Sequence, residues 1–345
     1  MKNPKRTLMY REASQASDVA ALQYTLNAEM IGDLAQRLRM LDPQIIFTCA
    51  RGSSDHAATY AKYLIETRLR IPVVSQAPSI SSIYGAPLLH MKNQPFILIS
   101  QSGKSPDLLL SAEAARKAGA LVIAFVNEID SPLADLAEIV VPLHAGPEKS
   151  VAATKSYIAT LCALAHLVSD WTRAIEAREA VKMLPQLLNA AWADDWCAGV
   201  EMLRHAESMF VLGRGLTLGI AQEAALKFKE TSGIHAEAFS MAEVAHGPMA
   251  LVKSGFPLLI FPPADEAAVG MGSIVQQFLG REARIAVAGR QFDGAVSLGL
   301  PEKLDSVTAP IAMVQTFYAM VNAISVQRGY DPDRPPLLQK VTETI

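Results

Sequence analysis

Short apolar runs alternate with helical patterns along most of this chain. Runs typical of buried strands lie at 44–50, 72–76, 95–100, 121–126 and 138–143. In the second half, strands are expected at 208–213, 257–262, 284–288 and near 305–308, and helices at 218–232, 267–280 and 311–327. Because parallel strands are joined by crossover helices, this alternation predicts βαβ units and parallel sheets.

A long helical pattern precedes the first strand. Leu22, Leu26, Leu34 and Leu38 belong to an apolar stripe at helical spacing, which predicts one helix over 8–41 that must pack against other elements. Other helical patterns lie at 56–68, 107–118, 151–171 and 177–205, and the proline-rich tail from Gly329 is expected to be extended.

The two halves share one layout, displaced by about 163 residues. FTCARGSS at 47–54 aligns with FVLGRGLT at 210–217, and each reads as an apolar strand, a Gly turn and the start of a helix. Two further strand pairs follow in the same order. We interpret this as a duplication, and strand ends of this type are where α/β sheets bind ligands.

Composition supports an α/β protein with buried parallel sheets, since half of the 345 residues are hydrophobic and aromatic residues are few. The expected organisation is a helical segment at 1–42, a first domain at 43–175, a second domain at 195–328 and a tail at 329–345.

The net charge of −3 gives no reason to expect a nucleic acid or an anionic membrane as partner. Cys49, Cys162 and Cys197 lack paired spacing, so neither a disulfide framework nor a zinc site is indicated. The N-terminus lacks the apolar run of a signal peptide, and the apolar stretches considered are too short to span a bilayer. We expect a cytoplasmic protein that uses no metal or other cofactor.

The segment Ser100–Ser105 (SQSGKS) follows a buried-type strand and precedes a helix start. Backbone N–H groups, hydroxyls and the positive end of a helix converge in such a segment, and together they can hold a phosphate. Ser53 and Ser54, at the end of the neighbouring strand, could add hydroxyls to the same pocket. The alternative is that these residues only form turns and caps.

Glu223, Lys227 and Glu230 are spaced so that all three lie on one face of the expected helix 218–232. A carboxylate beside a cation can become a base that removes a carbon-bound proton, and the lysine can stabilise the resulting oxyanion. A solvated Glu–Lys pair is the alternative interpretation.

His235 and His246 stand eleven residues apart, which does not fit two metal ligands on one helix face. A histidine close to a sugar ring could instead move a proton to or from the ring oxygen, because its pKa lies near neutrality. Capping or core roles are the alternative.

Several motifs occur together in one order. They are RGSS at 51–54, SQSG at 100–103 with Ser105, VAATK at 151–155, LGRG at 212–215, EAALKFKE at 223–230, IHAE at 234–237, Glu243 with HGPMAL at 246–251, and PLLQK at 336–340. In this set the chain resembles the two-domain form of the sugar-isomerase (SIS) family, such as the isomerase half of glucosamine-6-phosphate synthase and the shorter amino-sugar phosphate deaminases. The resemblance implies an α/β fold of two tandem domains, each a doubly wound, flavodoxin-like parallel sheet flanked by helices.

The resemblance implies roles for individual residues. Expected ligands of the substrate's phosphate and hydroxyls are Ser54, Ser100, Gln101, Ser102 and Ser105, with Val151, Ala153 and Glu223 lining the pocket. Expected catalytic residues are Glu230 as the base between C1 and C2, Lys227 as its helper, His246 for ring opening and Lys340 at the open-chain carbonyl. Ala153 replaces a family serine, and Lys104 stands where the synthase usually has glutamate.

The resemblance also implies a homodimer whose active site takes His246 from a second subunit. The given sequence contains no glutamine amidotransferase domain, so we expect the deaminating direction, from glucosamine 6-phosphate to fructose 6-phosphate and ammonia. Deamination of galactosamine 6-phosphate, release of an amino acid from a fructosamine phosphate, and a non-catalytic sugar-phosphate sensor stay open as alternatives.

Overall fold

The computed structural model describes residues 3–302 and 304–340, which form two compact units. We call them the N unit, which comprises Asp18–Glu148, Lys155–Met183 and the described residues from Gln339, and the C unit, which comprises the described residues up to Ser17, Lys149–Thr154 and Leu184–Leu338. Each unit is therefore assembled from separate stretches of the chain. Residues 341–345 of the expected tail lie outside the described residues.

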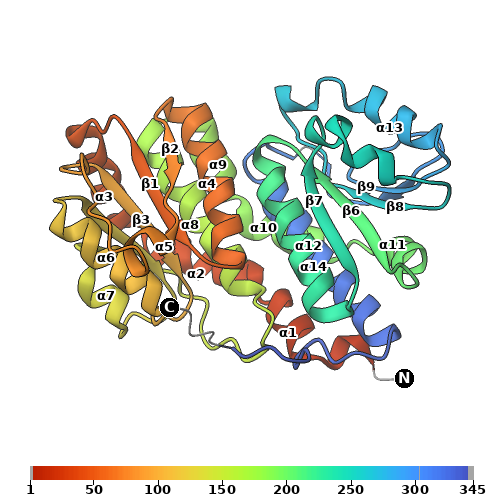
Figure 1. Ribbon diagram of the computed structural model, residues 1–345, viewed down its shortest axis with the longest axis horizontal. Coiled ribbons are helices and arrows are strands. Elements are labelled where there is room, and N and C mark those ends of the chain that lie inside the picture. The colour runs from red at the N-terminus through yellow and green to blue at the C-terminus, as the bar shows by residue number, and fades with distance from the viewer. Residues whose placement is uncertain (1–2, 303, 341–345) are drawn as a thin grey trace. The chain divides into compact units, whose positions relative to one another are not determined.

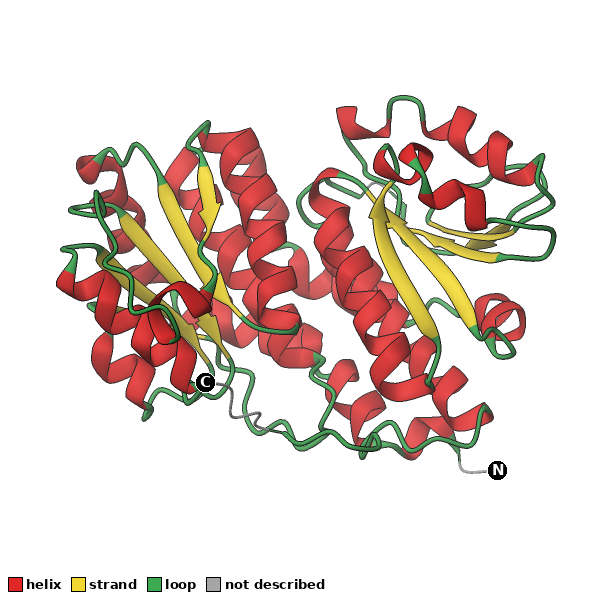
Figure 2. Cartoon of the chain, in the orientation of Figure 1, coloured by secondary structure: helices red, strands yellow, loops and turns green. Residues whose placement is uncertain are grey.

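The N unit contains a parallel sheet in the order β2-β1-β3-β4-β5 (Figures 1 and 2). Its strands are β1 (Ile46–Ala50), β2 (Val73–Ser75), β3 (Pro95–Ser100), β4 (Leu121–Val126) and β5 (Ile139–Pro142). The helices are α2 (Ala16–Leu26), α3 (Ala28–Leu41), α4 (Ser53–Leu69), α5 (Pro78–Ser82), α6 (Pro106–Lys117), α7 (Pro132–Leu136), α8 (Lys155–Thr172) and α9 (Ile175–Lys182).

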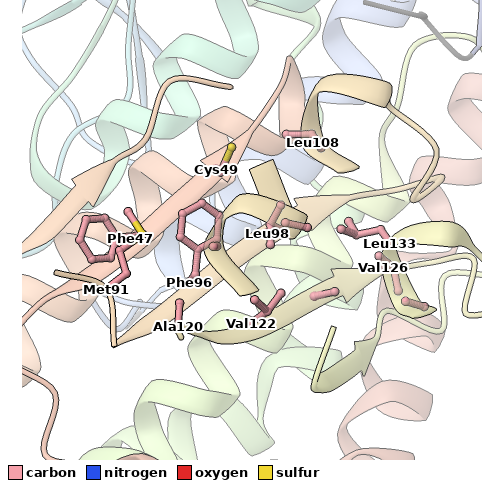
Figure 3. Packing of buried hydrophobic residues seen from close by; sticks show 14 residues of the cluster. Phe47, Cys49, Met91, Phe96, Leu98, Leu108, Ala120, Val122, Val126 and Leu133 are labelled. Carbon is pink, nitrogen blue, oxygen red and sulfur yellow. The ribbon is translucent and has the colours of Figure 1, made fainter. Parts of the chain in front are cut away.

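The core of the N unit follows from strands that are buried on both faces. Alternate residues of β1 and β3, including Phe47, Phe96 and Leu98, point towards α6 and α7 and meet Leu108 and Leu133 there (Figure 3). The opposite face is covered by α4, which packs on β1 and β3 and in turn on α8. The continuous apolar strands predicted from the sequence are explained by this two-sided burial.

The C unit contains a parallel sheet in the order β10-β9-β8-β6-β7. Its strands are β6 (Ser208–Gly213), β7 (His235–Ser240), β8 (Pro257–Ile260), β9 (Arg284–Ala288) and β10 (Val296–Leu298). The helices are η1 (Pro4–Arg6), α1 (Leu8–Ser14), α10 (Leu184–Trp192), α11 (Cys197–Leu203), η2 (Gly215–Thr217), α12 (Leu218–Ser232), η3 (Glu243–His246), η4 (Pro248–Leu251), η5 (Glu266–Ala268), α13 (Met271–Leu279) and α14 (Ala309–Gln327). Read in chain order, its strands repeat the order of the N unit, so the predicted pair of doubly wound domains is confirmed.

One strand prediction in the second half is wrong, and two strands were missed. The segment 305–308 is a turn, because the Asp305 carboxylate accepts the backbone N–H groups of Val307 and Thr308 and leads directly into α14. The last strand is instead β10. The strand β7 was missed, because exposed His235, which alternates with buried Ala236, was considered as a possible functional residue and not as part of a strand.

The helix predicted over 8–41 is divided into α1, α2 and α3. One break falls at Asn27, whose side-chain amide donates to the Pro142 carbonyl at 2.8 Å. Because of this division, the expected apolar stripe is buried at Leu34 and Leu38 but not at Leu22 and Leu26, which are 51% and 55% exposed.

All three cysteines are free thiols. Burial raises the pKa of Cys49 and of Cys162 to about 12, so both remain protonated at neutral pH, while Cys197 is exposed. Among the described residues, α14 alone is long and apolar enough to cross a membrane, but 89% of that stretch is buried inside the protein, as expected for a core helix.

Candidate functional site

The first group of predicted site residues lies at the carboxyl edge of the N unit's sheet. We call Ser100–Ser105, which connects β3 to α6, the hydroxyl loop. The Gly103 N–H donates to Ser100 Oγ at 3.1 Å and the Lys104 N–H donates to Ser102 Oγ at 3.4 Å. A hydroxyl that accepts such a bond keeps its own proton for donation. The loop therefore carries O–H donors of the kind a phosphate requires.

The hydroxyl loop is held closely against the chain that follows β4. The Gly103 carbonyl accepts from Leu133 N at 3.1 Å, and the Gln101 carbonyl accepts from Asn127 N at 3.2 Å. Gly103 has a φ of 63°, and a Cβ on it would lie 2.2 Å from Ser131 Oγ. Only glycine fits this position without a shift of its neighbours.

Ser54 lies at the adjacent strand end, in the first turn of α4. Because β1 pairs in parallel with β3, the turns that follow the two strands emerge at the same edge of the sheet. Arg51, which belongs to the RGSS motif and had no predicted role, also stands at this edge. Its Nε donates to the fully buried carboxylate of Asp107 at 2.8 Å, while about half of the Arg51 side chain (49%) is exposed. A guanidinium held in this way has further N–H donors for an anion.

Val151 and Ala153 lie on Lys149–Thr154, a segment that belongs to the C unit. The Val151 N–H donates to the Asp333 carbonyl at 3.2 Å, and the Glu12 carboxylate accepts from Lys149 N at 2.6 Å. Backbone contacts with α1 and with the tail thus fix this segment. Lys104 is exposed, and no contact with the described residues explains why lysine stands at this position.

The second group lies on α12 of the C unit. Glu223, Lys227 and Glu230, which we call the carboxylate–lysine triad, do meet on one face of this helix. Lys227 Nζ lies 3.2 Å from Glu223 Oε1 and 2.7 Å from Glu230 Oε2. The side chains of Glu223 and Lys227 are 0% and 1% exposed, whereas that of Glu230 is 21% exposed. Within the triad, Glu230 is therefore the carboxylate that a substrate can reach.

Charge and burial oppose one another at Lys227. Burial lowers the pKa of this ammonium, but the carboxylates of Glu223 and Glu230 outweigh burial, and the net direction is upward. Lys227 is consequently a permanent cation at neutral pH. The Tyr318 hydroxyl on α14 donates to Glu223 Oε1 at 2.9 Å and fixes the inner carboxylate. Tyr318 was missed, because it lies 95 residues from its partner.

His246 is the last residue of η3 in the C unit, and its ring is exposed. Lys340 belongs to the N unit, where its Nζ lies 3.2 Å from Glu148 Oε2. Glu148 was also missed by the sequence analysis. Within the described chain, no cluster of three or more His, Cys, Asp or Glu side chains is placed to hold a metal ion.

The predicted site residues are thus divided between the units. The hydroxyl loop, Ser54 and Lys340 belong to the N unit, and the triad, His246, Val151 and Ala153 belong to the C unit. The structure brings the serine-rich strand ends together in the N unit, and it brings the triad together in the C unit. The joint pocket and the individual roles stay predictions.

Comparisons with known proteins agree on the kind of fold. The family model described as "SIS domain" matches residues 40–169 and 202–323. A glutamine–fructose-6-phosphate aminotransferase (isomerizing) from Thermococcus kodakarensis is 32% identical over 330 residues, which are 91% of this chain and 54% of that protein. The chain spans about half the length of the curated relatives it matches.

Two solved structures are also similar. A provisionally assigned phosphosugar isomerase from Silicibacter pomeroyi DSS-3 has a TM-score of 0.90 at 38% identity, covering 95% of this chain and 100% of that one. The C-terminal domain of glucosamine-fructose-6-phosphate aminotransferase from Francisella tularensis has a TM-score of 0.83 at 25% identity, covering 96% and 98%.

Proposed function

This chain belongs to the SIS domain family and has the fold of phosphosugar isomerases, and from that premise we propose that it converts glucosamine 6-phosphate and water to fructose 6-phosphate and ammonia. The observation that carries the proposal is the carboxylate–lysine triad, in which a buried permanent cation holds one partly exposed carboxylate. An aldose–ketose isomerase needs such a base to move a proton between neighbouring carbons.

In the proposed reaction the hydroxyl loop and Ser54 bind the phosphate, and His246 transfers a proton to the ring oxygen as the ring opens. Glu230 then removes the C2 proton, which gives an enolamine, and returns a proton to C1. The product is an imine at C2. Addition of water to that imine releases ammonia and leaves the C2 ketone.

The support for each role differs in kind. Glu230 is held by a hydrogen-bonded ion pair with Lys227, which fixes the position of the carboxylate. Lys227 itself is almost fully buried, which favours a role in holding Glu230 over direct contact with substrate. The phosphate role of the hydroxyl loop rests on its place between β3 and the start of α6.

We further propose that the protein works in the cytoplasm as a homodimer in which His246 completes the partner's site, as the family resemblance implies. The exposed ring of His246 is compatible with contact to a second copy. The expected partner is a small amino-sugar phosphate, with neither a nucleic acid nor a membrane required.

Glu230→Gln is the direct test. The amide has the shape of the carboxylate but cannot accept the C2 proton, so we expect kcat on glucosamine 6-phosphate to fall by about 10² to 10⁴. Binding of the substrate, followed by calorimetry, should persist. Glu201→Gln is the matched control, because that carboxylate is a surface residue of the same unit, 60% exposed. Full turnover by Glu230→Gln would exclude Glu230 as the base.

The same assay separates the alternatives. Galactosamine 6-phosphate and a fructosamine 6-phosphate are tested beside glucosamine 6-phosphate, with ammonia, ketose phosphate and free amino acid measured as products. Faster turnover of either alternative substrate would show that it is the preferred substrate, and the proposal that Glu230 is the base would still stand. Binding of all three without turnover would favour the sensor over an enzyme.

A further inference from the structure

The tail lysine reaches a buried carboxylate that the proposed mechanism does not use. Lys340 Nζ lies 3.2 Å from Glu148 Oε2, and the two residues stand 192 positions apart in the chain. The Glu148 side chain is 0% exposed and that of Lys340 is 27% exposed. A carboxylate removed from water to this degree is stable only if hydrogen bonds and an opposite charge compensate it.

Glu148 is itself held rigidly. It lies ahead of α8, where it accepts from the backbone N–H of Ser156 at 3.2 Å and from Ser156 Oγ at 2.7 Å. The N-terminal end of a helix carries partial positive charge, so it favours a carboxylate at this place. The oxygen that faces Lys340 is therefore fixed by the N unit and does not depend on the tail.

The tail residues next to Lys340 offer little to hold it. Leu337 is fully exposed, Leu338 is 42% exposed, and Gln339 is exposed as well. The lysine stem is flexible and rotates freely unless its ammonium is bound. The pairing with Glu148 therefore attaches this ammonium to a rigid part of the N unit.

We infer that Glu148 is a positioning residue that fixes the Lys340 ammonium for its role at the open-chain carbonyl. This inference rests on the proposed function for the chemistry, but the anchoring itself is a property of the N unit. Glu148 touches neither substrate nor reacting atoms in this scheme. It acts only through Lys340, and that dependence can be measured.

The first experiment measures anchoring without any substrate. Lysines of the folded protein are acetylated with limiting reagent and quantified by peptide mass spectrometry, with Lys117, whose side chain is 78% exposed, as the internal reference. In Glu148→Gln we expect Lys340 to react roughly tenfold faster relative to Lys117 than in the wild type, because a partly buried ion pair is lost. The glutamine oxygen can still accept from Ser156 N, and its NH2 group can donate to Ser156 Oγ, so the start of α8 is preserved.

Glu138→Gln is the matched control, since it removes a carboxylate from an ion pair with Arg37 on the surface of the same unit, where both side chains are about half exposed. Its Lys340 should react as in the wild type. An unchanged Lys340 rate in Glu148→Gln would overturn the inference. A faster rate in both variants would overturn it too, because the effect would then not be specific to Glu148.

The second experiment measures coupling in catalysis. Glu148→Gln, Lys340→Gln and the double variant are compared in kcat and KM on glucosamine 6-phosphate. A residue that acts only through Lys340 adds nothing once Lys340 is gone, so the double variant should be no slower than Lys340→Gln. Losses that multiply would overturn the inference. If wild-type protein turns over no sugar phosphate at all, the proposed function fails, while the acetylation rates still decide whether Glu148 anchors Lys340.

Discussion

Lys227 shows how one buried charge can organise a site at the scale of a single residue. Its ammonium lies between Glu223 and Glu230, and Tyr318 holds the inner carboxylate from α14. Glu230, the other carboxylate, remains partly exposed. The ion pair with Lys227 thereby fixes the position of Glu230, the proposed base.

Replacement of Lys227 by methionine should therefore affect stability as well as rate. The buried Glu223 carboxylate loses its cation, which should lower the free energy of unfolding by about 3 to 5 kcal/mol. Urea unfolding measures this, with Lys229→Met as control because Lys229 is exposed on the same helix. A loss of similar size in both variants would contradict the assignment.

The pH dependence of this loss follows from the raised pKa of Lys227. A raised folded pKa stabilises the protein fully below the unfolded value of 10.5, and the contribution disappears only as pH rises through the folded value. The stabilisation that Lys227 itself gives the wild type should thus stay constant from neutral to mildly alkaline pH.

The sequence predicted the triad because helical spacing alone places its three residues on one face. Tyr318 and Glu148 could not be predicted, since each meets its partner only through the tertiary fold, across 95 and 192 positions. Periodicity reports neighbours on one element. It carries no information about which distant side chain supports them.

At the scale of the element, the hydroxyl loop depends on Gly103. Gly103→Ala should raise KM for the sugar phosphate roughly tenfold with a smaller change in kcat, because the Cβ would displace the loop or Ser131. Gly85→Ala is the matched control, with a similar φ of 57° and nothing within 4 Å of the added Cβ. Equal kinetic effects in the two variants would show that backbone strain, and not the contact with Ser131, matters.

The contact between α2 and α8 includes a titratable group. His166 is buried and stacks on Tyr24 with ring centroids 4.6 Å apart. Burial lowers the pKa of His166 below 6.5, so the folded state favours the neutral ring. Stability from this group is present above pH 6.5 and is lost as pH falls towards the folded value.

We expect the free energy of unfolding to fall between pH 7.5 and pH 5.5, with His166 contributing at most about 1.4 kcal/mol for each pH unit. His166→Gln should reduce this dependence. Urea midpoints at the two pH values measure it, and His205→Gln, a change at an exposed histidine, should keep the wild-type slope. A steeper slope in His166→Gln would contradict the argument.

Strands buried on both faces were predictable from their apolar runs, whereas β7 and β10 were not. β7 follows α12 at one edge of its sheet within the described chain, and its polar positions hide the run. β10 spans only Val296–Leu298, and Ser297 between its two apolar residues leaves no apolar run to recognise. Strands such as these two are stabilised mainly by pairing with their neighbours, so their own residues give only a weak signal for a strand.

At the scale of the whole molecule, the duplication allowed the two units to diverge. In the N unit, the loop after β3 carries serines. In the C unit, the equivalent strand β8 is followed by Pro262 and Pro263, which offer no hydroxyl. Conversely, the triad stands on α12 and has no counterpart on α4. One topology thus supports two different sets of polar groups.

The proposed shared site predicts complementation between inactive subunits. If His246 acts on the partner's site, a hybrid of Glu230→Gln and His246→Asn subunits contains one intact site. Random mixing should then restore about a quarter of wild-type activity, because about half of the dimers are hybrids with one working site each. Refolding the two variants together and assaying ammonia release measures this. No recovery, with dimers present by light scattering, would place His246 in its own subunit's site or outside catalysis.

The distance along the chain between Glu148 and Lys340 has a consequence for biosynthesis. The N unit's sheet can be complete long before the ribosome reaches the tail, because Lys340 follows Glu148 by 192 residues. A prematurely terminated chain could fold the sheet of the N unit and yet lack Lys340, whose ammonium pairs with Glu148. Competence for turnover would then be acquired only by chains translated past Lys340, so that chains aborted earlier remain inert towards the metabolite pool.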